Sequence, residues 1–195
     1  MAELTTGQSV LLTDLALCVN RYRLFTPGIY VCIHVPVLLD AQTRIVPGLV
    51  AMVNHGRLKQ CEPLERGFEG PPNFVLDVFT AGDLAEYERR RALFERFGVT
   101  EYVAVEDGES PTLHWNRAED GRFQAVEPDA AGLIRSKALP GLWIPTDALA
   151  RRDWWAILSA IERGVTRLGH HEFQETIWHT NQRTGHEGPL PFDAG

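Results

Sequence analysis

Six consecutive residues of this chain, 74–79, have the sequence FVLDVF and are apolar except for Asp77. A continuous apolar run of this length is typical of a strand that is buried on both faces, whereas a strand with one wet face alternates apolar and polar residues. The run therefore predicts a central strand that other elements cover on both sides. Asp77 then becomes a buried carboxylate, which has to be paired, bound to a metal or neutralised.

The segments before this run predict a helix followed by a β-hairpin. Residues 8–22 place apolar side chains at helical spacing. Residues 29–39 and 44–53 are rich in β-branched and apolar residues and are separated by a polar turn, which predicts two antiparallel strands. Pro36 and Pro47 indicate an edge or bulges within these strands, because proline has no N–H to donate.

The segments around and after the run alternate loop, helix and strand. Residues 54–72 are polar and rich in glycine and proline, which predicts a loop. Residues 83–97 predict a helix with Asp83 as its N-cap and Gly98 as its stop. Residues 101–106 predict the next strand.

The C-terminal part of the sequence predicts additional strands and one helix. Short strands are expected at 111–116 and 122–126, and a helix at 152–164. From about residue 180 the sequence lacks periodicity, which predicts a flexible tail that adds little to folding. The expected fold is thus an α/β core of order αβββαβ, a mixed sheet flanked by helices, with extra C-terminal strands and a helix.

Length, charge and cysteine content narrow the class of protein. A chain of 195 residues suits one domain with a short extension. The N-terminus lacks a basic start and an apolar signal core, and no run approaches a membrane span, so a cytoplasmic protein without a membrane partner is expected. Its three widely spaced cysteines, Cys18, Cys32 and Cys61, argue against a disulfide framework or a zinc site. The net charge of −7 disfavours DNA as a partner.

Four segments carry a family resemblance: VPGLV at 46–50, PNFVLDVFT at 72–80, FERFGVTEYVAV at 94–105 and SKALPGLWIPTDAL at 136–149. In this order they resemble the putative restriction endonuclease family of the PD-(D/E)XK superfamily, whose third strand has the pattern P-D-L-V-V-E-V-L-S. The match spans roughly residues 6–150, so a nuclease-like domain is expected over 1–150 and a helix with a tail over 151–195.

The resemblance implies a metal-dependent endonuclease site that this sequence has lost in part. The family's chemistry uses an acid on each of two neighbouring strands to hold a divalent ion, normally magnesium, and a lysine near the cleaved phosphodiester. Carried over by position, the first acid becomes Gly48, which offers no ligand. The second becomes Asp77, so any metal bound there alone is held weakly or not at all. The lysine is best matched by Arg90, which is not a base at neutral pH.

The residues themselves give Asp77 and Arg90 a second interpretation. Arg90 follows Tyr87 by three positions and precedes Phe94 by four, which places it on the apolar stripe of the predicted helix. An inward arginine beside an inward aspartate predicts a buried salt bridge that replaces the metal site.

Two hypotheses from different classes follow. One is a magnesium-dependent DNA endonuclease that uses Asp77, with an unidentified acid in place of Gly48; the available acids are Asp40, Glu86 and Glu101. The other is a non-catalytic protein that keeps the scaffold for binding or regulation, needs no cofactor, and partners with another protein or a second copy of itself. The altered positions and the acidic charge favour the second.

The remaining candidates have simpler structural explanations. Arg89, Arg90 and Arg91 form a basic run among glutamates, which is typical of a solvated helix face. Trp154 and Trp155 are expected to cover the sheet. The histidines match no metal-binding pattern, and we expect His34 to lie in a strand and the C-terminal group to be exposed; that group comprises His170, His171, His179 and His186.

Overall fold

A computed structural model describes residues 4–184, and side chains as far as residue 177. Its centre is a six-stranded sheet of order β1-β4-β7-β8-β9-β10. The strands are β1 (Ile29–Ile33), β4 (Leu49–Val53), β7 (Phe74–Phe79), β8 (Glu101–Glu106), β9 (Thr112–Glu119) and β10 (Arg122–Ala125). β7 and β8 are parallel and all other neighbours are antiparallel, so the predicted mixed sheet is confirmed.

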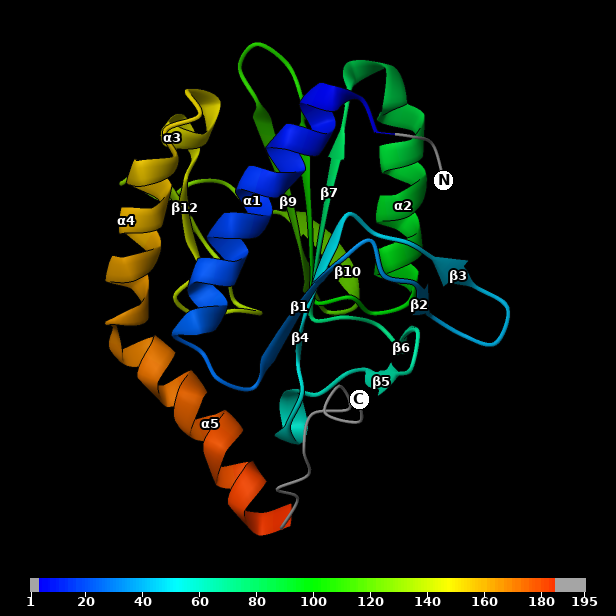
Figure 1. The fold of residues 1–195 in the computed structure, drawn as a ribbon, viewed down its shortest axis with the longest axis vertical. Coiled ribbons are helices and arrows are strands. Elements are labelled where there is room, and N and C mark those ends of the chain that lie inside the picture. The colour runs from blue at the N-terminus through cyan, green and yellow to red at the C-terminus, as the bar shows by residue number, and fades with distance from the viewer. Residues whose placement is uncertain (1–3, 185–195) are drawn as a thin grey trace.

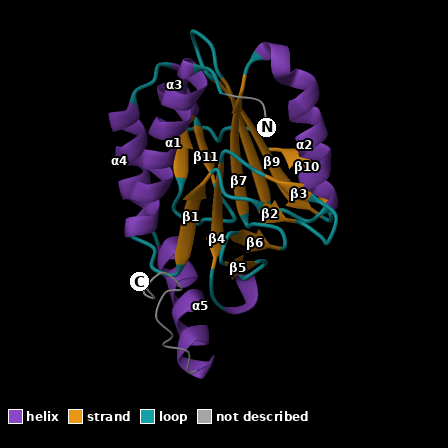
Figure 2. Cartoon of the chain, turned by 45° about the vertical axis from the view of Figure 1, so that its right-hand side comes forward, coloured by secondary structure: helices purple, strands orange, loops and turns teal. Residues whose placement is uncertain are grey.

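β7 occupies the middle of this sheet, between β4 and β8, and all six of its residues are buried. Helices α1 (Thr6–Leu24) and α4 (Trp154–Val165) cover one face of the sheet, and α2 (Leu84–Arg96) covers the other (Figures 1 and 2). Within the sheet and its first two helices the order is α1, β1, β4, β7, α2, β8. The predicted αβββαβ core and its central strand are therefore confirmed.

Alternation along β7 divides the interior into two cores. Phe74, Leu76 and Val78 join the core beneath α1 and α4, whereas Val75 and Phe79 join the core beneath α2. This split follows from the period of two that side chains have in a strand. Asp77 has the same parity as Val75 and Phe79, so it lies on the α2 face.

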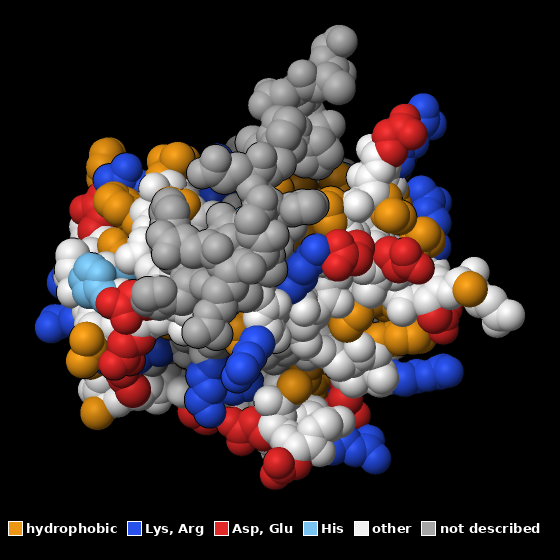
Figure 3. Space-filling model, turned by 90° about the horizontal axis from the view of Figure 1, so that it is seen from below, with side chains coloured by type: hydrophobic (Ala, Val, Ile, Leu, Met, Phe, Trp, Pro, Cys, Tyr) orange, Lys and Arg blue, Asp and Glu red, His pale blue; other side chains and the backbone are white. Residues whose placement is uncertain are grey.

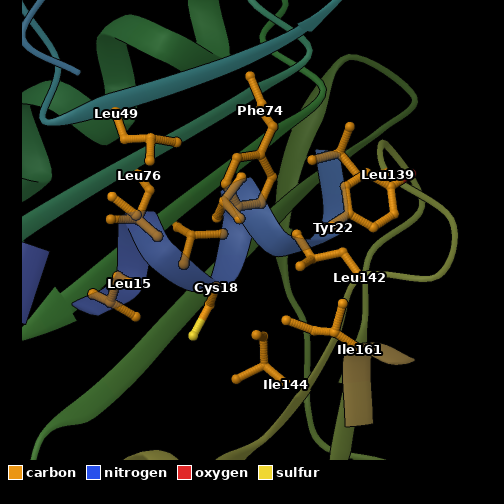
Figure 4. Close-up of a cluster of buried hydrophobic side chains, with 14 of the residues drawn as sticks. Leu15, Cys18, Tyr22, Leu49, Phe74, Leu76, Leu139, Leu142, Ile144 and Ile161 are labelled. Carbon is orange, nitrogen blue, oxygen red and sulfur yellow. The ribbon is translucent and has the colours of Figure 1, made fainter. Parts of the chain in front are cut away.

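The core beneath α1 is built from one buried stripe of that helix. Leu15, Cys18 and Tyr22 belong to the same buried cluster as Leu76 and Phe74 of the sheet, and the Tyr22 ring lies beside Leu139 and Leu142 (Figure 4). The helix begins with a capping box in which the Thr5 side chain accepts from the Gln8 N–H and the Gln8 side chain accepts from the Thr5 N–H. Each large apolar side chain buried in this way contributes roughly 1.5–3 kcal/mol of transfer free energy.

The predicted hairpin is present, but each of its two long strands is interrupted. β1 pairs with β4, and beyond the break β2 (Val37–Leu38) pairs with β3 (Arg44–Ile45). The break falls at residues 34–36 and 46–48, which contain the two prolines. Because proline cannot donate to a ladder, the pairing lapses there and resumes further along the hairpin.

Residues 54–72 are not the loop that their composition predicted. They contain a short helical turn η1 (Gly56–Leu58) and the strands β5 (Glu62–Leu64) and β6 (Gly67–Glu69). These strands complete a small sheet of order β3-β2-β6-β5. Glycine is required at Gly67, where φ is 121° and a Cβ would lie 2.1 Å from the Pro36 backbone oxygen. The glycines that indicated a loop thus allow a close backbone approach between strands.

The start of α2 differs from the prediction, whereas its end agrees. Asp83 does not cap α2 with its side chain; it closes a preceding turn, η2 (Ala81–Asp83), by accepting hydrogen bonds from the N–H and the hydroxyl of Thr80. Gly98, with φ of 78°, follows the last turn of α2 as expected of a helix stop.

The C-terminal region contains more helix than the sequence indicated. After β11 (Leu133–Arg135), β12 (Trp143–Pro145) and α3 (Thr146–Ala150) come α4, close to the predicted 152–164, and α5 (Leu168–Thr184). The expectation of irregular structure from residue 180 is wrong as far as Thr184; residues 185–195 lie outside the described part of the chain.

Helix α5 escaped prediction because its apolar positions are few. Phe173 and Ile177 pack into the core, whereas Leu168 is exposed. On α4 the two tryptophans also differ: Trp154 packs against the core, but Trp155 is 81% exposed and does not cover the sheet. Among the described residues, none of the helices has the length and apolarity that a membrane crossing requires.

Candidate functional site

The structure places Asp77 and Arg90 in direct contact beneath α2. Arg90 Nε donates to Asp77 Oδ2 over 2.8 Å, and Arg90 Nη2 donates to Asp77 Oδ1 over 3.0 Å. The Asp77 and Arg90 side chains are only 11% and 16% exposed. The predicted buried salt bridge is therefore present in bidentate form, the geometry in which arginine holds a carboxylate most firmly.

Gly48 lies beside this pair at the start of β4. The pairing of Leu49 with Leu76 sets Gly48 opposite Asp77, and the Gly48 N–H donates to Asp77 Oδ1 over 2.7 Å. A Cβ atom at Gly48 would lie 2.9 Å from the backbone oxygen of Leu76. The sequence showed that Gly48 lacks a ligand; the structure adds that the backbone leaves little room for one.

Arg90 has further partners that hold its guanidinium in place. Nη2 also donates to the Val46 carbonyl over 3.2 Å, and Nη1 lies 3.8 Å from Glu86 Oε1. Its guanidinium carbon lies 5.7 Å from the centroid of the Phe94 ring. Burial acts to lower the pKa of Arg90, but the Asp77 carboxylate outweighs it and raises that pKa. Arg90 is therefore a fixed cation and cannot take up a proton.

The Asp77 carboxylate also affects its neighbour Tyr102 on β8. Burial, together with the nearby negative charge of Asp77, raises the pKa of Tyr102 well above its usual range. The Tyr102 hydroxyl is therefore protonated at neutral pH and is not a base. None of the three groups gathered here, Asp77, Arg90 and Tyr102, is free to activate a water molecule.

A divalent metal does not fit these residues. Hard cations require several oxygen ligands, and both Asp77 oxygens already accept hydrogen bonds, from Arg90 and from the Gly48 N–H. Within residues 4–184, no three of the histidine, cysteine and acidic side chains described come together in a way that could hold a metal ion.

The acids considered as substitutes for Gly48 are engaged elsewhere. Asp40 is exposed and accepts from the N–H groups of Gln42 and Thr43. Glu86 accepts from Arg89 through both of its oxygens. Glu101 has the parity of Val103 on β8, whose side chain joins the core beneath α1, so it lies on the sheet face opposite Asp77. None of the three supplies a second ligand at the Asp77 position.

Glu101 is a second buried carboxylate. Its structural role was not predicted from the sequence. Its side chain is fully buried and accepts from Arg117 Nε over 2.8 Å. It also accepts from the Ser136 hydroxyl and from the N–H groups of Lys137 and Ala138. Glu101 therefore fixes the loop that follows β11. Part of the signal was in the sequence, because Glu101 directly precedes the apolar residues of the strand predicted at 101–106.

The other candidate residues occupy different environments. His34 is not in a strand; it lies at the break after β1 with φ of 52° and is exposed. His170 is buried at 2% exposure with its Nε2 2.9 Å from the Thr26 hydroxyl, which corrects the expectation of an exposed side chain. His171 is exposed as predicted. The side chain of His179 and the whole of His186 lie outside the described residues.

The basic run on α2 does not form a basic patch. Arg89 is paired with Glu86, Arg90 is buried against Asp77, and Arg91 donates to Asn116 Oδ1 over 2.8 Å. On the face of the molecule drawn in Figure 3, Lys and Arg side chains are interspersed with Asp and Glu side chains. The coloured part of that face therefore lacks a continuous positive surface of the kind that attracts a DNA backbone.

Comparison with known proteins gives two findings. A family model named Uma2 and described as "Putative restriction endonuclease" matches residues 1–147. The fold is similar to that of a crystal structure described as a putative nuclease belonging to DUF820 from Anabaena variabilis ATCC 29413, with a TM-score of 0.53. That match has 10% sequence identity and covers 82% of this chain and 84% of the other. No curated protein matches the sequence.

Proposed function

Because the chain belongs to the Putative restriction endonuclease family, we propose that it keeps that family's scaffold without metal-dependent cleavage and acts by binding or regulation. The observation that carries this proposal is the bidentate contact of Arg90 with Asp77, which occupies both oxygens of the one acid left at the family's position. A metal ion would have to displace a buried, charge-assisted pair before it reached that carboxylate.

The second support is steric. The missing acid would have to come from Gly48, where a Cβ would approach the Leu76 backbone oxygen to 2.9 Å and Leu12 Cδ1 to 3.3 Å. A backbone oxygen cannot rotate aside as a side chain can, so an aspartate there would fit only if β4 shifted relative to β7, which a closely packed interior resists. The double change Gly48→Asp with Arg90→Lys restores the family's residue types, and on these distances we expect it not to restore metal binding.

The third support is electrostatic. The chain carries a formal net charge of −7, which opposes the approach of a polyanionic substrate. A protein partner is therefore favoured over DNA as the molecule that this scaffold recognises.

The proposal is tested by metal binding and by cleavage together. We expect isothermal titration with MgCl₂ or MnCl₂ to show no saturable binding at Asp77, and supercoiled plasmid to remain uncut in either metal. Asp77→Ala is the matched variant: it should be less stable yet indistinguishable from the parent in both assays.

Plasmid cleavage that requires magnesium and is lost in a folded Asp77→Ala protein would contradict this proposal. It would support the alternative, an active magnesium-dependent endonuclease that uses Asp77. Cleavage that persists in Asp77→Ala would instead indicate a contaminating nuclease or a different site on the chain.

A further inference from the structure

The last strand of the main sheet covers only part of its neighbour. β10 pairs with residues 116–119 of β9, and the final contact is the Val126 N–H donating to the Trp115 carbonyl over 2.8 Å. Residues 112–114 of β9 pair with β8 on one side. On the other side, no strand among the described residues pairs with them. Residues 112–114 therefore form a sheet edge without a paired strand, although helix α3 contacts β9 nearby.

The pairing pattern identifies which backbone groups face this free edge. In an antiparallel ladder, successive residues point their N–H and C=O groups alternately to either side. Trp115 directs its carbonyl toward the β10 side, and Ala118 directs its N–H to Thr100 on the opposite side. Leu113, two residues before Trp115, therefore directs its N–H and C=O outward, away from β8.

A groove of about 410 Å³ runs along this edge. Tyr87, His114 and Asn116 line it on the α2 face of the sheet, and Ile134 and Ala150 line it on the other face. The groove thus has a partly polar wall and a partly apolar wall with a strand edge between them. An added strand directs its side chains alternately to the two faces, which matches such a pair of walls.

Two side chains that line the groove have buried nitrogen atoms without a hydrogen bond in the described part of the chain, His114 Nε2 and Trp115 Nε1. Glu106 Oε2 lies 3.6 Å from His114 Nε2 as an ion-pair partner, so Trp115 Nε1 is the more significant of the two. Trp115 is almost wholly buried as a residue and lines the groove. An unpaired buried indole N–H is unfavourable, and native proteins satisfy nearly all such groups. The Trp115 indole N–H thus lacks an acceptor in a residue that lines the groove.

We propose that this groove binds an extended polypeptide segment of a partner protein, which adds as a short strand alongside Leu113. A polypeptide backbone supplies an acceptor and a donor at the spacing that a strand edge requires, as in other cases of strand addition. The contact is short, because the edge exposes one outward-facing residue before the turn at Ser110 and Pro111, so the binding is weak and depends on backbone hydrogen bonds.

The charge of the groove lining favours a peptide segment over a nucleic acid and over a second copy of the chain. The lining contains no lysine or arginine, and its one acidic residue is Glu127; Glu106 Oε2 lies 3.6 Å from His114 Nε2. A nucleic acid would find no cation for its phosphates. A second copy paired edge to edge about a twofold axis would bring like acidic groups together, because such contacts are self-complementary. The lining therefore favours a peptide segment flanked by basic residues.

This site goes beyond the proposed loss of catalysis and does not depend on it. Asp77 and Arg90 do not line the groove. Peptide binding at β9 and metal binding at Asp77 are therefore measured separately, and either proposal can fail while the other stands.

The test uses the full chain and a fluorescein-labelled heptapeptide amide, Lys-Thr-Val-Thr-Val-Thr-Lys, in fluorescence anisotropy. Leu113→Pro removes the outward N–H without removing a donor to β8, and Leu113→Ala removes the side chain but keeps that N–H. We expect the proline variant to bind at least tenfold more weakly than the parent, and the alanine variant to bind within about twofold of it. Hydrogen exchange should show the Leu113 amide slowed by the peptide in the parent protein.

Two control peptides test whether binding depends on the basic flanks and on an extended backbone. The same peptide with glutamate in place of lysine should bind more weakly, and one with proline at its centre should not bind. The proposal is overturned if the lysine peptide does not bind at millimolar concentration, or if folded Leu113→Pro binds like Leu113→Ala. It is equally overturned if sedimentation shows a dimer of the parent that Leu113→Pro abolishes, since the occupant is then a second copy.

Discussion

Two buried carboxylates lie on the adjacent parallel strands β7 and β8, on opposite faces of one sheet, and each is held by an arginine. Asp77 meets Arg90 from helix α2, whereas Glu101 meets Arg117 from its neighbouring strand β9. Glu101 also binds the Ser136 hydroxyl and two N–H groups of the following loop. Asp77 has the Gly48 N–H as its additional donor.

The different partners of Asp77 and Glu101 show that a buried ion pair by itself does not reveal the function of its carboxylate. Glu101 organises a loop and two strands, so its removal would leave several buried donors unpaired. Asp77 stands where the sequence resemblance implies a metal ligand, and in the structure Arg90 balances its charge. The predictions below therefore test whether the two carboxylates differ in structural importance.

Glu101→Ala should produce the largest loss of stability. The change leaves Arg117, Ser136 and two backbone N–H groups without their acceptor, and breaking such a buried pair costs roughly 3–5 kcal/mol, with the upper end expected here. Urea denaturation measures the difference directly. Glu101→Gln, which keeps the shape and some of the acceptors, should lose less; an equal loss in both variants would show that charge alone matters at this position.

Asp77→Ala should lose less, about 3 kcal/mol, because one arginine and one N–H lose their acceptor. Arg90 keeps the Val46 carbonyl and the partly exposed Glu86 as partners. The same urea experiment, run beside Glu101→Ala, gives the order. If Asp77→Ala proved the more damaging change, the loop contacts of Glu101 would be less important than their number suggests.

Gly48→Ala should destabilise the protein by roughly 1–3 kcal/mol, as overpacking does in a well-packed interior. The added Cβ meets the backbone oxygen of Leu76, which cannot move aside as a side chain can. Gly108→Ala is the matched control, because a Cβ there has nothing within 4 Å. Melting curves that are identical for the two variants would mean that β4 shifts easily, and would reopen the question of a ligand at residue 48.

The double change Asp77→Leu with Arg90→Met should have the smallest effect. Replacing both members of a buried pair by apolar residues of similar size is often neutral or stabilising by about 1–4 kcal/mol. At this site the Gly48 N–H is the one additional donor that loses its acceptor. The corresponding change Glu101→Leu with Arg117→Met should be more destabilising, because the Ser136 hydroxyl and two loop N–H groups lose theirs. Equal stability of the two double variants would remove the distinction between the sites.

The core of the fold could be predicted from sequence because burial on both faces leaves a clear pattern. The apolar run 74–79 indicated β7, and the helical spacing of 83–97 indicated α2. Arg90 was placed correctly for the same reason, since its position on the apolar stripe of α2 directs it toward β7. Prediction thus succeeded for a strand that is apolar on both faces, as in β7, and for a helix long enough to repeat its buried stripe, as in α2.

The remaining features depend on contacts that periodicity does not record. The strands β5 and β6 are three residues each, and their glycines resemble those of a loop until their backbone contacts are known. Helix α5 buries too few apolar residues to produce a stripe. The steric restriction at Gly48 comes from Leu76 on another strand, so no local pattern could indicate it. The groove beside Leu113 likewise exists because β10 is shorter than β9.

The tight fit of Gly48 bears on whether the family's residues can return one at a time. Gly48→Asp alone places a carboxylate against a backbone oxygen and beside Asp77, while Arg90 still occupies the remaining acid. Arg90→Lys alone gives up the bidentate contact and restores no ligand. Neither single reversal restores a metal site, and the double reversal still places the side chain of residue 48 against the Leu76 backbone oxygen.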